Sequence, residues 1–102
     1  MKKRPDKNEI LARLRAHAGE LRAQGILHAF LFGSIARGDG GPDSDIDIAV
    51  EIDPKQRVGL VALVRLQRHL SELLGGKADV TTLPVRNERL RSTIRDEAIR
   101  AF

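Results

Sequence analysis

The sequence of 102 residues contains no cysteine, no tryptophan and no tyrosine, and only three phenylalanines. Without cysteine the chain forms neither disulfides nor thiolate metal sites, which is compatible with a reducing compartment. The shortage of aromatics leaves a core of Leu, Ile, Val and Ala. It also removes the stacking platforms that single-strand nucleic-acid binders use, which argues against nucleic acid as the partner.

Long apolar runs are also missing. No stretch is long enough to span a membrane, and no signal-peptide-like segment follows the basic N-terminus. We therefore predict a cytoplasmic protein without membrane association. The length suits one domain, and we expect a flexible basic tail over 1–7 and a single domain over 8–102. The net charge of +4 favours anionic partners such as nucleotides, nucleic acid or an acidic protein.

The apolar residues that are present are spaced for alternating helices and strands. Residues 26–32 are apolar on both alternating faces apart from His28, which is typical of a strand buried on both sides. Asp53 and Pro54 together read as the capped start of a helix. We predict helices over 8–24, 53–74 and 87–102, and strands over 26–32, 45–51 and 77–83. The predicted fold class is α/β of the α+β type, a small mixed β-sheet backed by helices.

Two aspartates, Asp45 and Asp47, are the most informative polar residues. Two positions apart on a strand, they project from one face, opposite an isoleucine-lined face. Carboxylates placed in this way repel each other unless a cation or a proton intervenes. Magnesium prefers such sites, usually with substrate phosphates completing its shell, and two ions can stabilise both oxygens of an in-line displacement. Taken alone, an Asp-x-Asp pair is more often the solvated polar face of a strand.

A Gly33-Ser34 pair follows the apolar strand 26–32 and precedes a probable helical turn. Glycine lets the backbone approach a phosphate closely. The serine hydroxyl and the N–H groups of the new turn can bind phosphate oxygens. By itself the pair also fits an ordinary strand-to-helix turn with Ser34 as the N-cap. Together with Asp45 and Asp47, ten residues further on, it is far more specific.

The segment Gly33-Ser34-Ile35-Ala36-Arg37-Gly38, followed by Ser44-Asp45-Ile46-Asp47, resembles the signature of the polymerase-β-like nucleotidyltransferase superfamily, and specifically its minimal nucleotidyltransferase (MNT) branch. The resemblance runs from the first predicted helix to the last. It implies the nucleotidyltransferase fold, ATP as the substrate and Mg²⁺ as the cofactor, with two ions expected. It also implies that Gly33 and Ser34 hold the triphosphate and that Asp45 and Asp47 bind the metal.

The resemblance extends to two further residues. A third carboxylate of the family comes from a later strand, where it helps to bind metal and to activate the attacking hydroxyl, and here Asp79 is the candidate. Arg37 falls where the branch carries an arginine. It is expected either to face phosphate or to form a salt bridge that steadies the loop. Asp39 and Asp43 lie in the glycine-rich loop, where turn-forming roles are expected.

Domains of this size resemble the antitoxin of HEPN/MNT toxin–antitoxin pairs. That resemblance implies transfer of AMP from ATP to a tyrosine hydroxyl of a HEPN-type toxin, the expected protein partner. Because this chain has no tyrosine, such a target must lie on another protein. Two alternatives stay open at this point. One is a non-catalytic antitoxin that neutralises the toxin by contact, and the other is a nucleotidyltransferase that acts on RNA ends or a small molecule.

Overall fold

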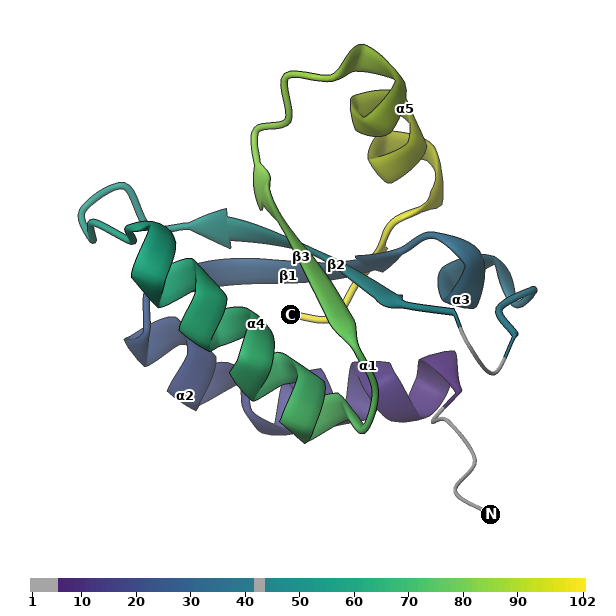
Figure 1. The fold of residues 1–102 in the computed structure, drawn as a ribbon, viewed down its shortest axis with the longest axis horizontal. Helices are drawn as coiled ribbons and strands as arrows, with labels where there is room; N and C mark the ends of the chain where they lie inside the picture. The colour runs from purple at the N-terminus through teal and green to yellow at the C-terminus, as the bar shows by residue number, and fades with distance from the viewer. Residues whose placement is uncertain (1–5, 42–43) are drawn as a thin grey trace.

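A computed structural model describes residues 6–41 and 44–102 of the chain. These residues form helices and strands in an alternating order, as Figure 1 shows. The helices are α1 (Lys7–Ala16), α2 (Ala18–Ala23), α3 (Ser34–Arg37), α4 (Leu60–Leu74) and α5 (Glu88–Glu97). The strands are β1 (Ile26–Phe32), β2 (Ile46–Ile52), β3 (Ala78–Leu83) and β4 (Ile99–Arg100).

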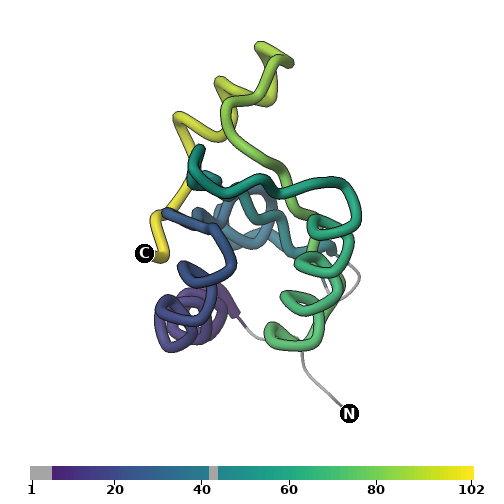
Figure 2. Tube along the Cα trace, turned by 90° about the vertical axis from the view of Figure 1, so that its left-hand side faces the viewer, coloured from purple at the N-terminus to yellow at the C-terminus, as the bar shows by residue number. Residues whose placement is uncertain are grey.

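The four strands make one mixed sheet in the order β3-β2-β1-β4. Strand β1 pairs antiparallel with both β2 and β4, whereas β2 pairs parallel with β3. Helices α1, α2 and α4 lie side by side on one face of the sheet, and α5 lies on the other (Figures 1 and 2). The predicted fold class, a small mixed sheet backed by helices, is confirmed.

The main core lies between the sheet and the layer of α1, α2 and α4. Residues Ile46, Ile48 and Val50 of β2 are fully buried there, as the alternating pattern predicts. On the opposite face a smaller cluster forms under α5. Side chains from alternate positions of β1 reach both clusters, which confirms a strand covered on its two faces. The buried members of the smaller cluster are Phe32, Ala49, Val85 and Ile94.

Two of the predicted helices differ from the structure in their bounds: the one expected over 8–24 and the one expected over 53–74. The helix expected over 8–24 begins at Lys7, capped by Asp6, and divides at His17, whose backbone leaves the helical region just before Gly19. The helix expected from Asp53 begins only at Leu60. The Asp53 carboxylate accepts the Lys55 N–H at 2.9 Å, so it closes a local turn instead of capping a helix.

The predicted last helix, 87–102, also ends early. Asn87 caps α5 as expected, accepting the Leu90 N–H at 3.1 Å, but the helix ends at Glu97. Residues 99–100 then add β4 to the edge of β1, and the Ala101 N–H donates to the Ala29 carbonyl at 2.8 Å. The extended ending buries Phe102 in the main core, a gain that a continued helix would forgo.

Of the predicted tail 1–7, residues 1–5 lie outside the described part of the chain. Among the residues that the structure does describe, none of the helices has the length and apolar character needed to cross a membrane.

Candidate functional site

The site lies where β1 ends and β2 begins, beside α3 (Figure 1). Gly33 joins β1 to α3 with φ +82° and ψ −158°, a conformation open essentially only to glycine. A Cβ built on Gly33 would overlap the Asp47 carboxylate, with Oδ2 as its nearest atom. Gly33 is therefore required twice, once for its backbone angles and once because the Asp47 carboxylate packs directly against its Cα.

Ser34 is the first residue of α3 and is half-buried. Its hydroxyl makes no hydrogen bond within the described part of the chain, so it does not cap the helix and is free to accept or donate elsewhere. The first intrahelical bond of α3 runs from the Arg37 N–H to the Gly33 carbonyl at 3.1 Å. The N–H groups ahead of Arg37 consequently have no partner inside this helix, which leaves donors for an anion.

The sheet register brings the predicted carboxylates together. Asp47 pairs with Phe32 across the antiparallel ladder and with Asp79 across the parallel one. Paired residues on neighbouring strands lie about 5 Å apart and share a face, so the Asp47 and Asp79 side chains project together. Asp45 precedes β2 by one residue, and its negative charge is close enough to raise the pKa of Asp47. The register thus puts Asp47 and Asp79 on one face, with Asp45 nearby.

Helix α4 fixes the part of β3 that carries Asp79. The Ala78 N–H donates to Ser71 Oγ at 2.9 Å, and the Val80 N–H donates to Gln67 Oε1 at 3.1 Å. The Ser71 and Gln67 side chains therefore accept the backbone N–H groups on the unpaired edge of β3, one on each side of Asp79. The Asp79 side chain itself stays exposed. Reasoning from sequence missed both Ser71 and Gln67, because only the tertiary contact between α4 and β3 shows their role.

Electrostatics at the site favour a bound cation. Burial raises the pKa of Asp47 above its ordinary value of 3.8, and repulsion from Asp79 and Asp45 raises it further, while Arg37 lowers it. A divalent cation would relieve this repulsion, so the donor set fits magnesium. Across residues 6–41 and 44–102, no three His, Asp or Glu side chains form a ready-made metal cage. Sites of the magnesium type usually use one or two carboxylates and complete the shell with phosphates and water.

Two cations lie beside the carboxylates. The Lys77 ammonium is 3.9 Å from Asp45, at the point where the Lys77 carbonyl accepts the Ile46 N–H. Arg37 pairs with Glu97 of α5 at 2.9 Å and with Asp39 at 3.5 Å. These pairs raise the pKa of Arg37, the hydrogen bond to Glu97 contributing most.

Of the two roles expected for Arg37, the structure therefore shows the ion pair, which ties α3 to α5. Sequence reasoning missed Glu97 as its partner because the two residues lie 60 positions apart, and only the placement of α5 beside α3 brings them together. Pairing with Glu97 still leaves Arg37 close enough to lower the pKa of Asp47. Asp43, the other loop aspartate considered from the sequence, lies outside the described residues.

A mixed sheet with a Gly-Ser turn against a strand aspartate is the arrangement that the resemblance to nucleotidyltransferases led us to expect. Residues 13–101 match the family model described as "Nucleotidyltransferase domain", and the chain belongs to this family. It is 39% identical over 79 residues to a protein of Methanocaldococcus jannaschii provisionally named a protein adenylyltransferase, covering 78% of this chain and 83% of that one. It is 34% identical over 92 residues to the protein adenylyltransferase MntA of Thermococcus cleftensis, covering 89% and 91%.

Solved structures show the same fold. One that is provisionally described as a minimal nucleotidyltransferase superposes with a TM-score of 0.77 at 31% identity, covering 96% of this chain and 98% of the other. A toxin–antitoxin complex with AMP-PNP gives a TM-score of 0.69 at 23% identity, covering 96% and 73%. A tri-AMPylated Shewanella oneidensis HEPN toxin in complex with its MNT antitoxin gives 0.66 at 20% identity, covering 91% and 71%.

Proposed function

We propose that this nucleotidyltransferase transfers AMP from ATP to a hydroxyl, a tyrosine hydroxyl by preference, of a HEPN-type partner protein and thereby acts as an antitoxin. The names of the Methanocaldococcus and Thermococcus relatives support protein adenylylation. The fold shared with an MNT antitoxin bound to an AMPylated HEPN toxin supports the nature of the partner. The absence of tyrosine from this chain agrees with an acceptor on another protein.

The contact between Gly33 and Asp47 is the observation that carries the proposal. It places a turn suited to phosphate binding directly against a carboxylate suited to magnesium. We assign the triphosphate to Gly33, to the Ser34 hydroxyl and to the first N–H groups of α3. Asp45, Asp47 and Asp79 would hold magnesium, with two ions expected. When bound, the metal would neutralise charge on the phosphates and on the pyrophosphate that leaves.

In the proposed reaction the acceptor hydroxyl oxygen forms a bond to the α-phosphorus of ATP. The bond from that phosphorus to the α–β bridging oxygen breaks, and pyrophosphate leaves on the opposite side. We assign the hydroxyl proton to the Asp79 carboxylate, and its exposure to solvent, against the half-buried Asp47, supports this assignment. The chain contributes mainly by positioning the two reactants and by offering preorganised charge.

The test is co-expression with a HEPN-type protein from the same organism, followed by intact mass measurement of both chains. The partner should gain one or more AMP units with the wild type and none with Asp45→Asn/Asp47→Asn. Glu51→Gln is the matched control, because it removes an exposed carboxylate from the other end of the same strand. A partner of unchanged mass in a stable complex would favour neutralisation by contact alone. Labelled RNA that gains AMP instead would favour the RNA-end alternative.

A further inference from the structure

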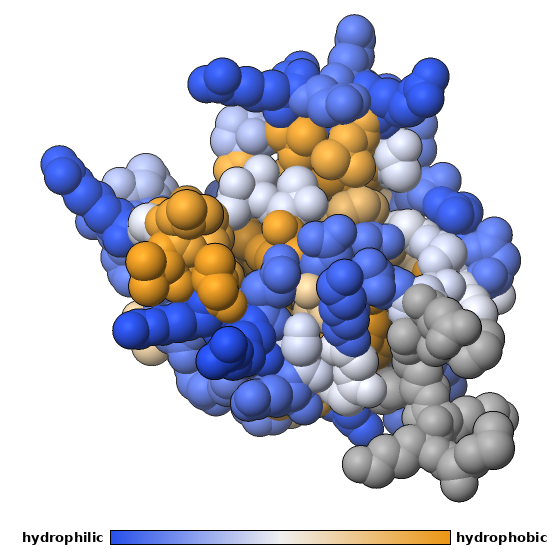
Figure 3. All heavy atoms as spheres, viewed as in Figure 1, coloured by the Kyte–Doolittle hydropathy of each residue, from blue (hydrophilic) through white to orange (hydrophobic). Residues whose placement is uncertain are grey.

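The first two turns of α4 expose an apolar surface that no other described residue covers. Leu60, Val61 and Val64 are 78%, 66% and 57% exposed, the large hydrophobic side chains most open to solvent in the described structure. They form the orange patch at the left of Figure 3, over the start of α4. Exposed apolar clusters of this kind on a small soluble domain commonly mark an interaction site.

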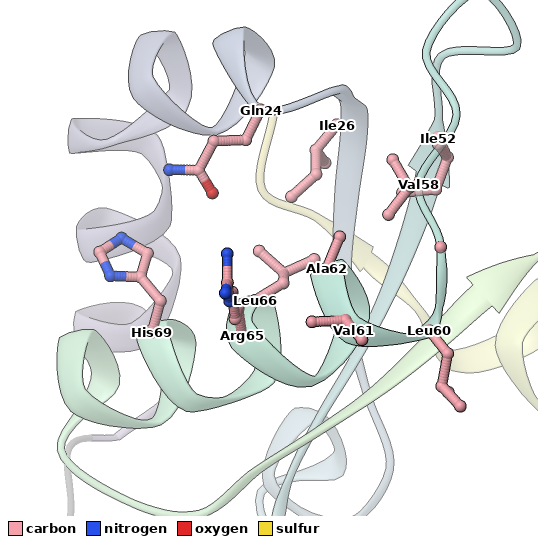
Figure 4. A pocket seen from close by; sticks show the side chains of 11 residues that line it. Gln24, Ile26, Ile52, Val58, Leu60, Val61, Ala62, Arg65, Leu66 and His69 are labelled. Atoms are coloured by element: carbon pink, nitrogen blue, oxygen red, sulfur yellow. The ribbon is translucent and has the colours of Figure 1, made fainter.

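This patch continues into a groove of about 750 Å³ between α4, the end of α2 and the adjoining ends of β1 and β2. Figure 4 shows Gln24 and His69 on one side of the groove and Ile52 and Val58 on the other. The floor is largely apolar, with Leu66 of α4 at its centre. Patch and groove together form a concave surface, here called the α4 surface, which suits a protruding apolar segment.

Charge around the α4 surface is mostly positive, with Glu20 against the groove residue His69 at 3.1 Å and Asp53 next to the groove residue Ile52 as the acidic groups. Arg65 lines the groove, Arg57 adjoins the groove residue Val58, and Arg68 lies one helical turn beyond Val64. None of these three arginines forms an ion pair with another residue of the described chain. They contrast with Arg13, Arg37 and Arg95, which all have acidic partners.

The start of α4 also lacks the devices that usually complete a helix end. Its N-cap is Gly59, with no side-chain cap hydrogen bond, and its first turn contains no acidic residue. The free N–H groups and the positive end of the helix dipole therefore meet solvent. An acidic group on a bound protein could accept hydrogen bonds from these N–H groups, interact favourably with the helix dipole and pair with the arginines.

Resting on the proposed function, we propose that the α4 surface is the docking site for the acceptor protein, which inserts an apolar segment flanked by acidic side chains. The charge argues against a second copy of this chain as the occupant, because two such surfaces would bring like charges together. The surface lies beside Ile26 and Ile52, whereas the candidate site lies beside Phe32 and Asp47. These are opposite ends of β1, about 20 Å apart, so docking leaves the site open for ATP and the acceptor hydroxyl.

The experiment measures the affinity of purified wild type and variants for the HEPN-type protein that gains AMP in the co-expression test. The patch variant, Leu60→Gln/Val61→Gln/Val64→Gln, replaces the apolar patch by glutamine, which is polar and favours helix. The charge variant, Arg65→Glu/Arg68→Glu, reverses the charge beside the groove. Each should weaken binding about tenfold or more. Ala12→Gln/Ala16→Gln, at exposed positions of α1, is the matched control and should bind as the wild type does. Circular dichroism of each variant should match that of the wild type, which checks that the variant is folded.

AMP transfer measured on the same samples separates this proposal from the proposed function. The patch variant should raise KM for the partner and leave kcat unchanged at saturation, because the candidate site is untouched. Asp45→Asn/Asp47→Asn should bind normally and transfer nothing. If the patch and charge variants bind the partner with wild-type affinity, the α4 surface is not the docking site. AMP transfer by the wild type would then still establish the enzyme activity.

Two further results would also overturn it. A wild-type dimer that the patch variant abolishes would assign the surface to a second copy of the chain. Wild-type binding to phosphatidylglycerol vesicles that the patch variant loses, with partner affinity unchanged, would assign the surface to an anionic membrane.

Discussion

The two faces of the sheet are built differently. The face under α1, α2 and α4 carries an extensive apolar core, whereas the face under α5 buries only Phe32, Ala49, Val85 and Ile94 among the described residues. The second face also carries Asp47, next to a glycine in a conformation that other residues rarely adopt. Repelling carboxylates persist only where the surrounding structure holds them together. The face under α1, α2 and α4 therefore provides most of the folding free energy, which offsets the cost of holding the Asp47 carboxylate beside other negative charges on the other face.

The largest expected effect tests the supporting face. Leu31, in the middle of β1, is fully buried in the main core. Leu31→Ala should lower the free energy of unfolding by about 3–5 kcal/mol, because it removes apolar burial and leaves a cavity that tight packing cannot close. Urea denaturation followed by circular dichroism measures the loss. A loss below about 1 kcal/mol would mean that this face is not the main source of stability.

A somewhat smaller loss is expected at the point where the two faces meet. Gly33→Ala forces a side chain into a backbone region that costs about 2–3 kcal/mol, and its Cβ would displace the Asp47 carboxylate. Gly38→Ala is the matched control, since Gly38 has φ +85° but open space around its Cα. The control should cost only about 1–2 kcal/mol, the penalty of the left-handed backbone. Gly33→Ala should in addition abolish AMP transfer. Equal activity in both variants would show that the contact with Asp47 is not needed.

Much of this arrangement is predictable from sequence, because it depends on local patterns. Alternation at Ile46, Ile48 and Val50 identifies β2 and assigns Asp47 to the opposite face. The parts that sequence reasoning misses depend on distant contacts. The helical pattern predicted that the last helix runs to residue 102. Instead, β4 pairs with β1 and buries Phe102 in the main core, a tertiary contact that the local pattern does not contain. The α4 start was placed too early because Asp53 caps a turn as readily as a helix.

The same limit applies within the site. The resemblance assigned Gly33 to the triphosphate and Asp47 to the metal, and the structure brings these two residues into contact. Lys77, Glu97 and the α4 side chains beside Asp79 were not predicted, because no local pattern marks a residue whose partner is far away in sequence. Their roles follow from the sheet register and from the packing of α4 and α5.

The thinner face should respond less to loss of a core side chain. Ile94 of α5 is buried but belongs to the small cluster, whose surroundings can relax toward solvent. Ile94→Ala should cost about 2 kcal/mol, at the low end for such substitutions. Urea denaturation alongside Leu31→Ala provides the direct comparison. If Ile94→Ala is as damaging as Leu31→Ala, the two faces contribute equally and the contrast between them fails.

The smallest expected effect has the opposite sign. Because burial and the negative charges of Asp79 and Asp45 raise the pKa of Asp47, its ionised form destabilises the folded chain. A raised pKa means that the favourable contribution of the protonated carboxyl is complete below the ordinary value of 3.8 and is lost as pH rises through the raised folded-state value. Asp47→Asn, which cannot ionise, should therefore gain stability relative to the wild type as the pH rises from 3 to 7.

Thermal unfolding in EDTA at several pH values measures this gain without interference from metal ions. Glu51→Gln, on the same strand with an exposed side chain, controls for the general effect of removing a carboxylate. Added magnesium should reverse the order at pH 7, since a cation stabilises the folded wild type by binding to it and the variant has lost a carboxylate ligand. If Asp47→Asn instead loses stability relative to the wild type as the pH rises in EDTA, the ionised carboxylate has a favourable partner in the folded chain. The site would then be balanced without a cation, and its contrast with the supporting face would be one of packing alone.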